Sequence, residues 1–407
     1  MGRQPGKAGP RLPARQGAVI LPRMPAVNSR TALVLGAGIM GLSAAWALAR
    51  SGWAVQVVEQ DPVPNPRGAS CDHHRLIRHA YGAEAGYMRM VDAAFAAWEL
   101  LWAELGQRLC VPTGVLAVAA GDDSWLDASR ATLRAGGHAV QDLTGADIAA
   151  RYPMLVGEGI ADGFHVAPGG ILLAERILAA LAGRCAALGV TVEQARAISV
   201  DPERARLRLD GGVERTADLL VVAAGPWAPR LLPGLAGRVT PSRQIVIYLD
   251  PPPAHRAAWE QAPMLLDLAT GFYAVPPVAG TPLKLGDHRF SLAGDAEADP
   301  RDARPEEAEA ILALAARRLR DPEGYRLLGA RACYYDVAEG ERFILEPLSP
   351  RSFLLSGFSG HGFKFAPLLG LALARAAGDP VMAAGLPAWA AGMAPPPAGL
   401  LRDVPLA

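Results

Sequence analysis

The pattern of apolar and polar positions is clearest between residues 31 and 59. Residues 31–35 form a short apolar run of the kind found in strands that are buried on both faces. An Ala-rich segment at 39–50 favours a packed helix, and a Ser-Gly pair follows it as a stop signal. Residues 55–58 then predict a second, parallel strand. The first folded unit is therefore expected to be strand, helix, strand.

Three glycines join the first of these strands to the helix. Gly36, Gly38 and Gly41 have G-x-G-x-x-G spacing, which permits a tight turn, the approach of backbone N–H groups to a pyrophosphate, and close packing of the helix on the sheet. Glu59 follows Gly41 by 18 residues, about where such folds place a carboxylate on the ribose hydroxyls of an adenine dinucleotide. The combination predicts a dinucleotide site, and the alternative is a glycine-rich turn in an ordinary α/β domain.

Further along the chain, helical and strand-like patterns alternate as far as residue 378. Residues 244–285 contain short strands separated by Pro and Gly turns, which is typical of an antiparallel sheet. A dinucleotide domain assembled from distant segments, with such a sheet inserted, suggests a flavoprotein more than a nicotinamide dehydrogenase. We expect helices at 86–105, 123–136, 145–151, 169–188, 305–320 and 365–378, strands at 111–120, 190–192, 218–223 and 353–357, and a hairpin at 205–216.

The composition is that of a globular enzyme. Hydrophobic residues make up 51% of the 407 positions and the formal net charge is zero, so there is no electrostatic reason to expect nucleic acid or an anionic membrane as a partner. No apolar run approaches the roughly 20 residues needed to span a bilayer, and no secretory signal is indicated. Cys71, Cys110, Cys185 and Cys333 form no C-x-x-C pair, which argues against structural zinc and a disulfide framework. We expect a soluble cytoplasmic protein.

Several further segments contain residues suited to chemistry. Residues 70–82 are dense in His and Arg, and Arg75 and Arg78 are close enough in sequence to line one pocket, although a solvated basic loop is the alternative. The segment also contains Asp72-His73-His74. Adjacent residues point apart, and no other ligands are suitably spaced, so no metal site is predicted.

Two lysines and one cysteine also stand out. Lys284 lies between two leucines in a strand-like run, where a buried lysine needs a reason. Residues 358–365, Phe-Ser-Gly-His-Gly-Phe-Lys-Phe, open the last helix, and their glycines and free N–H groups would suit a flavin edge or an oxyanion, with Lys364 as a second buried cation. Cys333, taken alone, is most simply a small core residue.

Together these segments resemble the monomeric sarcosine oxidase group of flavoprotein amine oxidases, which includes N-methyltryptophan oxidase and pipecolate oxidase. The resemblance runs from Ala32 to about Gly392 and rests on RLIRHAYG, LKLGDH, Ala-Cys-Tyr-Tyr and FSGHGFKF. It implies that Cys333 carries FAD through a thioether, that Arg75 and Lys284 face the flavin ring, and that this lysine takes part in the reaction with oxygen. The expected cofactor contacts are then Gly36, Gly38, Gly41, Glu59, Ser70, Arg75, Val192, Gly225, Cys333, Gly360, Gly362 and Lys364.

On the substrate side, the resemblance implies that Arg78 and Lys364 hold a carboxylate and that Tyr273 and His288 lie beside the substrate. The expected fold is α/β, with a Rossmann-like FAD-binding domain built from discontinuous segments and an antiparallel-sheet substrate domain. We expect the FAD domain at 29–108, 163–225 and 331–392, the substrate domain at 109–162 and 226–330, a disordered N-terminal extension at 1–28, with Met24 as an alternative start, and a C-terminal tail at 393–407.

Two residues depart from the family pattern and leave the substrate amine open. Cys71 stands where sarcosine oxidase has an active-site histidine, and Asp287 replaces an aromatic residue beside the lysine. For Lys284 itself, the alternative role is to offset a nearby carboxylate such as Asp287.

The expected reaction is oxidation of a secondary or N-methyl amino acid. Hydride passes to flavin N5, the imine hydrolyses, and oxygen becomes hydrogen peroxide. The expected partners are the amino acid and oxygen, and the expected state is a monomer. The alternatives are an FAD dehydrogenase that passes electrons to a quinone or an electron-transfer protein, and a flavin- or dinucleotide-binding protein that is not an enzyme.

Overall fold

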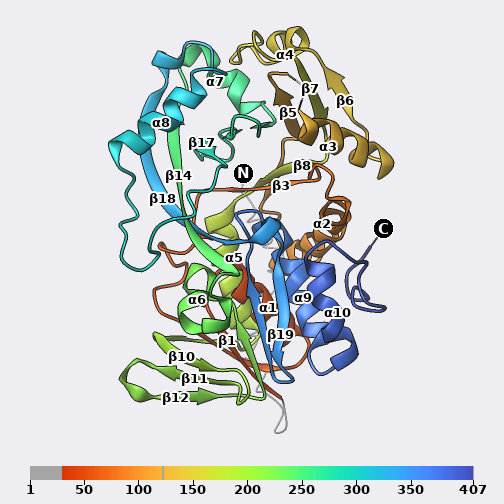
Figure 1. The fold of residues 1–407 in the computed structure, drawn as a ribbon, viewed down its shortest axis with the longest axis vertical. Coiled ribbons are helices and arrows are strands. Elements are labelled where there is room, and N and C mark those ends of the chain that lie inside the picture. The colour runs from red at the N-terminus through yellow and green to blue at the C-terminus, as the bar shows by residue number, and fades with distance from the viewer. Residues whose placement is uncertain (1–29, 122, 407) are drawn as a thin grey trace, which may run out of the picture.

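The computed structural model describes residues 30–121 and 123–406, so the extension expected at 1–28 lies outside the described residues. A sheet of six strands and a sheet of eight strands dominate the fold. Figure 1 shows the six-stranded sheet with its helices in the lower half of the molecule and the eight-stranded sheet in the upper half. The predicted α/β fold, with one mainly parallel and one mainly antiparallel layer, is confirmed.

The six-stranded sheet is assembled from segments far apart in the sequence. Its order is β19 (Ile344–Ser349), β20 (Ser352–Ser356), β13 (Leu219–Val222), β1 (Thr31–Leu35), β2 (Ala54–Glu59) and β9 (Thr191–Gln194). Neighbouring strands are parallel except for β19 with β20. The helix after the glycine loop, α1 (Ile39–Arg50), packs against α9 (Ala366–Ala376) and α5 (Ala174–Ala187). The predicted strand, helix, strand unit is therefore present and enclosed by later segments.

The eight-stranded sheet contains the antiparallel strands predicted between residues 244 and 285. Its order is β18 (Arg326–Ala338), β14 (Val239–Asp250), β17 (Leu283–Asp287), β16 (Phe272–Val275), β15 (Met264–Asp267), β5 (Val115–Ala119), β7 (Asp162–Val166) and β6 (Gln141–Leu143). Only β5 and β15 pair in parallel. Helix α8 (Pro305–Ala315) packs on β14, β16 and β17, and its first-turn Glu306 and Glu307 complement the positive end of the helix dipole.

A small third sheet corrects one prediction. The helix expected at 169–188 is shorter than expected, because its first residues form a strand. A Cβ on Gly170 would lie only 2.4 Å from the Val111 carbonyl oxygen, so glycine lets two strands approach closely here. The sheet has the order β3 (Arg75–Arg78), β8 (Gly169–Leu172), β4 (Cys110–Pro112), and the helix α5 begins only at Ala174.

Sheet membership also bears on the expected domain boundaries. Strand β18 pairs with β14 along its whole length, so the segment that starts at residue 331 begins inside the eight-stranded sheet. Strand β7 belongs to this sheet as well, although the second FAD segment was expected from residue 163. In Figure 1, β14 and β18 extend from the upper sheet toward the lower one. Cys333 lies on β18, where it pairs with Gln244 of β14.

The remaining elements surround these sheets. They are α2 (Ala85–Leu105), α3 (Ser124–Ala135), α4 (Gly145–Arg151), α6 (Ala228–Leu231), α7 (Pro253–Glu260), α10 (Pro380–Ala390) and a sheet of β10 (Ala197–Asp201), β11 (Arg206–Leu209) and β12 (Glu214–Thr216). Residues 393–406 form no helix or strand, yet Leu400 and Val404 are buried in the core. No helix of the described residues is long and apolar enough to cross a membrane.

Candidate active site

The glycine loop brings the N-terminus of α1 to a large cavity. A Cβ on Gly36, whose φ is +103°, would lie 2.4 Å from the Ala223 carbonyl oxygen, and one on Gly41 would lie 1.8 Å from the carbonyl oxygen of Gly36. Only glycine fits both positions, so the turn is tight and the helix lies close to the sheet. Ser70 Oγ accepts a hydrogen bond from the Ile39 N–H at 3.0 Å, and no acidic side chain occupies the first turn. The helix end therefore keeps its positive potential for an anion.

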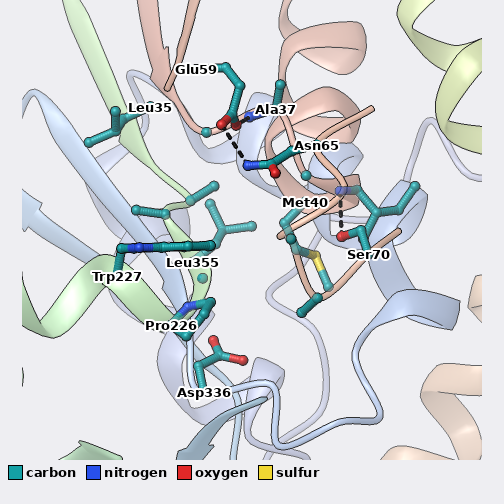
Figure 2. Close-up of a pocket in the computed structure, with 18 of the residues that line it drawn as sticks. Leu35, Ala37, Met40, Glu59, Asn65, Ser70, Pro226, Trp227, Asp336 and Leu355 are labelled. Atoms are coloured by element: carbon teal, nitrogen blue, oxygen red, sulfur yellow. Dashed lines mark hydrogen bonds between the residues drawn. The ribbon is translucent and has the colours of Figure 1, made fainter. Parts of the chain in front are cut away.

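Glu59 lies at this cavity with its carboxylate held in place. Figure 2 shows it beside Asn65 and Ala37, and it accepts hydrogen bonds from the Ala37 N–H at 2.7 Å and from Asn65 Nδ2 at 3.0 Å. Trp227 and Pro226 line another part of the wall. The cavity encloses about 1170 Å³ of space, part of it open to solvent. Its lining extends from Glu59 past the glycine loop to Arg75 and Phe363, which suits an elongated ligand such as FAD.

Most of the predicted cofactor contacts line this cavity, and Val192 does not. Val192 is 48% exposed on β9, at the edge of the sheet, whereas Ala195 and Ala197 farther along the chain reach the cavity. The contact at Val192 stays a prediction, and Ala195 and Ala197 are the residues of this stretch that line the cavity. Gly41 is not part of the cavity lining, and its lack of a Cβ lets α1 lie close to Gly36. The predicted residues that line the cavity are Gly36, Gly38, Glu59, Ser70, Arg75, Gly225, Gly360 and Gly362.

A second cavity continues from the first. The two share Arg75, Tyr335, Gly360 and Phe363. A dinucleotide that extends from Glu59 past the glycine loop would thus reach the second cavity with its other end. The predicted catalytic and substrate-binding residues and the predicted FAD-linked cysteine all line it: Arg75, Arg78, Tyr273, Lys284, His288, Cys333 and Lys364. The fold brings these residues together from both ends and the middle of the chain.

A buried carboxylate holds two of these cations. Asp72 is 3% exposed and accepts hydrogen bonds from Lys284 Nζ at 2.8 Å, from the Tyr248 hydroxyl at 2.6 Å, and from the guanidinium of Arg75. Burial alone would raise the pKa of Asp72, but the charges of Lys284 and Arg75 outweigh it and hold this pKa well below its usual value. Burial lowers the pKa of Lys284, and Asp72 opposes that shift. In the sequence, Asp72 stands out only as a possible metal ligand beside His73 and His74.

The other two cations have no carboxylate partner within ion-pairing distance among residues 30–121 and 123–406. Arg78 is 8% exposed, donates to the Ala80 carbonyl oxygen, and lies over the Tyr81 ring with 4.7 Å from its Cζ to the ring centroid. Lys364 is 3% exposed and donates to the Tyr81 hydroxyl at 2.9 Å and the His361 carbonyl oxygen at 2.7 Å. Burial and the charge of Arg78 hold the pKa of Lys364 well below its usual value. Two buried cations without a carboxylate partner in the described residues favour the binding of an anionic ligand.

The remaining titratable groups of the second cavity are uncharged at neutral pH. Burial, together with the charges of Arg78 and Lys364, lowers the pKa of His288 to about 4. Burial and then Lys364 lower the pKa of His361 well below its usual value, while burial raises that of Tyr273 well above its own. The positive charge of the cavity therefore comes from arginine and lysine.

Two cysteines and one aspartate also lie in or near the two cavities. Cys333 is a buried free cysteine, and burial raises the pKa of its thiol while Arg75 opposes the shift. Cys71 lines neither cavity, and its Sγ lies 3.8 Å from Glu175 Oε1. Asp336, which was not predicted, lines the first cavity, and burial raises its pKa to about 6 (Figure 2). Its only sequence signal is a lone acid within an otherwise apolar and aromatic segment.

Comparison with known proteins adds a decisive observation. The family described as "DAO: FAD dependent oxidoreductase" matches residues 31–376 of this chain. The chain belongs to this family of FAD-dependent oxidoreductases. This oxidoreductase is 27% identical over 357 residues to monomeric sarcosine oxidase of Bacillus sp. (strain B-0618), covering 85% of this chain and 91% of the relative. It is 26% identical over 360 residues to N-methyl-L-tryptophan oxidase of Yersinia pestis (strain Pestoides F), covering 85% and 94%.

Solved structures show the same fold. The open form of NikD, described as an unusual amino acid oxidase, has a TM-score of 0.76 at 20% identity and covers 91% of this oxidoreductase and 98% of its own chain. Glycine oxidase from Geobacillus kaustophilus has a TM-score of 0.73 at 21% identity, with 84% and 93% covered. The two connected cavities therefore lie in a chain of the fold and family that use FAD.

We expect Asp72→Asn to destabilise the folded oxidoreductase by about 3–5 kcal/mol at neutral pH, because Lys284 and Arg75 lose the charge that they share. The folded pKa of Asp72 lies below its ordinary value of 3.8, so its contribution is present above that pH and is lost as the pH falls through the folded pKa. Urea unfolding at neutral pH measures the difference.

Asp287→Asn is the matched control for this measurement. Asp287, the partner considered for Lys284 from the sequence, pairs instead with Arg289 at 2.8 Å, and that arginine side chain is 66% exposed. Its loss should change the stability by less than about 1 kcal/mol. Equal stability of the wild type and Asp72→Asn would contradict the shared-charge account.

Proposed function

We propose that this oxidoreductase oxidises a secondary or N-methyl amino acid to an imine, which hydrolyses to an aldehyde and an amine, while oxygen is reduced to hydrogen peroxide. The main support for this proposal is the pair Arg78 and Lys364. Both are buried cations without a carboxylate partner in the described part of the chain, and both line the cavity that opens from the proposed FAD site. A planar guanidinium grips a carboxylate through two N–H groups, and an ammonium adds a point charge. A substrate carboxylate would thus provide the missing negative charge.

The same positive charges act on the substrate amine. With one substrate carboxylate bound, Arg78 and Lys364 still carry one positive charge in excess, so the bound amine is favoured in its neutral form, from which hydride can leave the adjacent carbon. FAD, when bound, supplies the acceptor for that hydride. His288 and Tyr273 offer uncharged hydrogen-bonding groups to the substrate. An N-alkyl group would find apolar wall at Val246, Leu266 and Leu268.

We infer from Lys284 and Arg75 that oxygen is the electron acceptor. Their two positive charges exceed the single negative charge of Asp72, which leaves net positive charge beside the proposed flavin site. In a poorly hydrated cavity, such charge stabilises the negative charge that develops on oxygen. The alternative is a dehydrogenase that passes electrons to a quinone or a protein, and it draws support from Asp72, which weakens the positive field. Peroxide output over a panel of amines distinguishes the two.

Two structural assignments belong to this proposal. An FAD domain would be built on the six-stranded sheet and a substrate domain on the eight-stranded sheet, whose edge strand is β18. Cys333 on β18 would hold FAD through a thioether, because its buried thiol lines the cavity next to Arg75. The relatives named sarcosine oxidase and N-methyl-L-tryptophan oxidase support the substrate class.

The covalent link is tested by denaturation. Acid-precipitated wild type should be yellow and Cys333→Ser colourless, because only a covalent bond keeps flavin on an unfolded chain. Cys185→Ser, at a buried cysteine that lines neither cavity, should remain yellow. Release of all flavin from the wild type would refute the link.

Arg78→Ala should raise KM for amino-acid substrates about 30- to 5,000-fold, which corresponds to the roughly 2–5 kcal/mol lost when one partner of a buried charged contact is removed. Flavin content should stay unchanged, and it is read from the absorbance of the purified protein. Arg78→Lys keeps the charge without the bidentate fork, so it should lose less. If wild type oxidises decarboxylated amines as well as the acids, the carboxylate assignment fails.

Lys284→Met should slow reoxidation of the reduced enzyme by oxygen about a hundred- to several-thousand-fold, the equivalent of roughly 3–5 kcal/mol, and affect reduction by substrate less. The change keeps much of the side-chain volume and removes the charge. Anaerobic reduction in a stopped-flow instrument, followed by mixing with oxygen, separates the two half-reactions. An unchanged reoxidation rate would remove Lys284 from the oxygen step.

A further inference from the structure

Two histidines and an aspartate meet outside the active site. His79 directly follows β3, Asp92 lies in α2, and His138 follows α3. His79 Nε2 lies 2.9 Å from Asp92 Oδ1, and His138 Nε2 lies 3.6 Å from the same oxygen. One ligand atom from each residue lies within 4.8 Å of the other two. The centroids of the two imidazole rings are 4.3 Å apart.

The hydrogen bonds among the described residues do not satisfy all the polar atoms of His79, Asp92 and His138. His138 Nε2 is buried without a hydrogen-bond partner among them, and its distance from Asp92 exceeds hydrogen-bonding range. One carboxylate oxygen therefore serves His79 and leaves His138 unpaired. Protonation of both rings would not solve this, because two imidazolium ions at this separation repel each other. A shared cation would satisfy both imidazoles and the carboxylate.

We propose that His79, Asp92 and His138 bind a divalent transition-metal ion of the zinc class. Metal–ligand distances of about 2.0–2.2 Å place tetrahedral ligand atoms about 3.3 Å apart, and the two separations from Asp92 Oδ1 bracket that value. Two imidazoles and one carboxylate suit Zn²⁺, Co²⁺, Ni²⁺ or Cu²⁺, whereas Mg²⁺ and Ca²⁺ prefer oxygen ligands.

The exposed fractions of the three side chains indicate the side from which the ion would reach the site. The Asp92 side chain is 53% exposed, while those of His79 and His138 are 3% and 14% exposed. The ion would thus arrive from the Asp92 side, where water can complete its coordination. Bound there, it would tie together the end of β3, helix α2 and the segment after α3. Because His79 follows Arg78 in the chain, this tie lies next to the proposed carboxylate-binding residue.

No metal site was predicted from the sequence, because the three ligands are 13 and 46 residues apart and match no ligand spacing. The only histidine and aspartate cluster visible in the sequence was Asp72-His73-His74. Asp72 is instead occupied by Lys284 and Arg75.

The test is zinc binding to the full-length, FAD-loaded chain purified without a histidine tag, measured by competition with a chromophoric chelator. The wild type should bind one Zn²⁺ per chain. Asp92→Asn and His138→Asn each remove one of three protein ligands and should weaken the affinity about a hundredfold or more, since even outer-shell changes cost about 10–100-fold. Excess Mg²⁺ should not compete.

His255→Asn is the matched control. His255 Nε2 lies 2.9 Å from Asp321 Oδ2, the same separation as in His79 and Asp92, but no third ligand groups with this pair in the described part of the chain. Its substitution should leave the zinc affinity unchanged. Unchanged flavin absorbance in all variants shows that the fold is retained.

Two further readouts separate a specific site from loose adsorption. Co²⁺ in place of Zn²⁺ should give the wild type the intense visible d–d absorption of a four-coordinate site, and Asp92→Asn and His138→Asn should show only weak absorption. Zn²⁺ should raise the thermal midpoint of the wild type but not of these variants, because the site exists only in the folded chain. The proposal is overturned if the wild type binds no stoichiometric zinc, if both variants bind as the wild type does, or if His255→Asn loses as much affinity.

Discussion

The carboxylate of Asp72 connects three strands around the proposed active site. It lies just before β3, and its partners Lys284 and Tyr248 lie on β17 and β14, while Arg75 begins β3 itself. A buried carboxylate without positive partners would be strongly destabilising, and so would the two buried cations without it. Each group therefore requires the others to stay in place. This mutual requirement anchors β3, which also carries Arg78, against the eight-stranded sheet.

The four cations of the second cavity fall into two kinds. Arg75 and Lys284 share a carboxylate supplied by the protein, whereas Arg78 and Lys364 contact uncharged partners alone among the described residues. The first pair is held in position with or without a ligand. The second pair is held by the Tyr81 ring, its hydroxyl and carbonyl oxygens, so its charge is available to a ligand. In the second cavity, Arg75 and Lys284 are thus held in place by the protein, whereas Arg78 and Lys364 favour the binding of an anion.

Local sequence was a good guide where short-range patterns decide the structure. The glycine spacing, the apolar strands and the acid at the end of β2 all depend on a few neighbouring residues, and the structure has them as predicted. The helix expected at 169–188 failed because a pair of glycines begins a strand there, and only strands from elsewhere in the chain can require that. Val192 lies outside the cavity lining for a related reason. Which residues after β9 reach the cavity depends on the path of the chain past the sheet edge.

The sequence by itself determined the α/β class, the dinucleotide loop and, through its resemblance to a family, which arginines, lysines, histidine, tyrosine and cysteine gather at one site. It did not show which charges are paired. The partner of Lys284 is Asp72, 212 residues away, and not Asp287, three residues away. His79, Asp92 and His138 likewise form a group only where β3, α2 and the end of α3 meet. Only the tertiary structure decides such pairings, because charges and ligands act through space at a few ångströms, while separation along the chain says little about that distance.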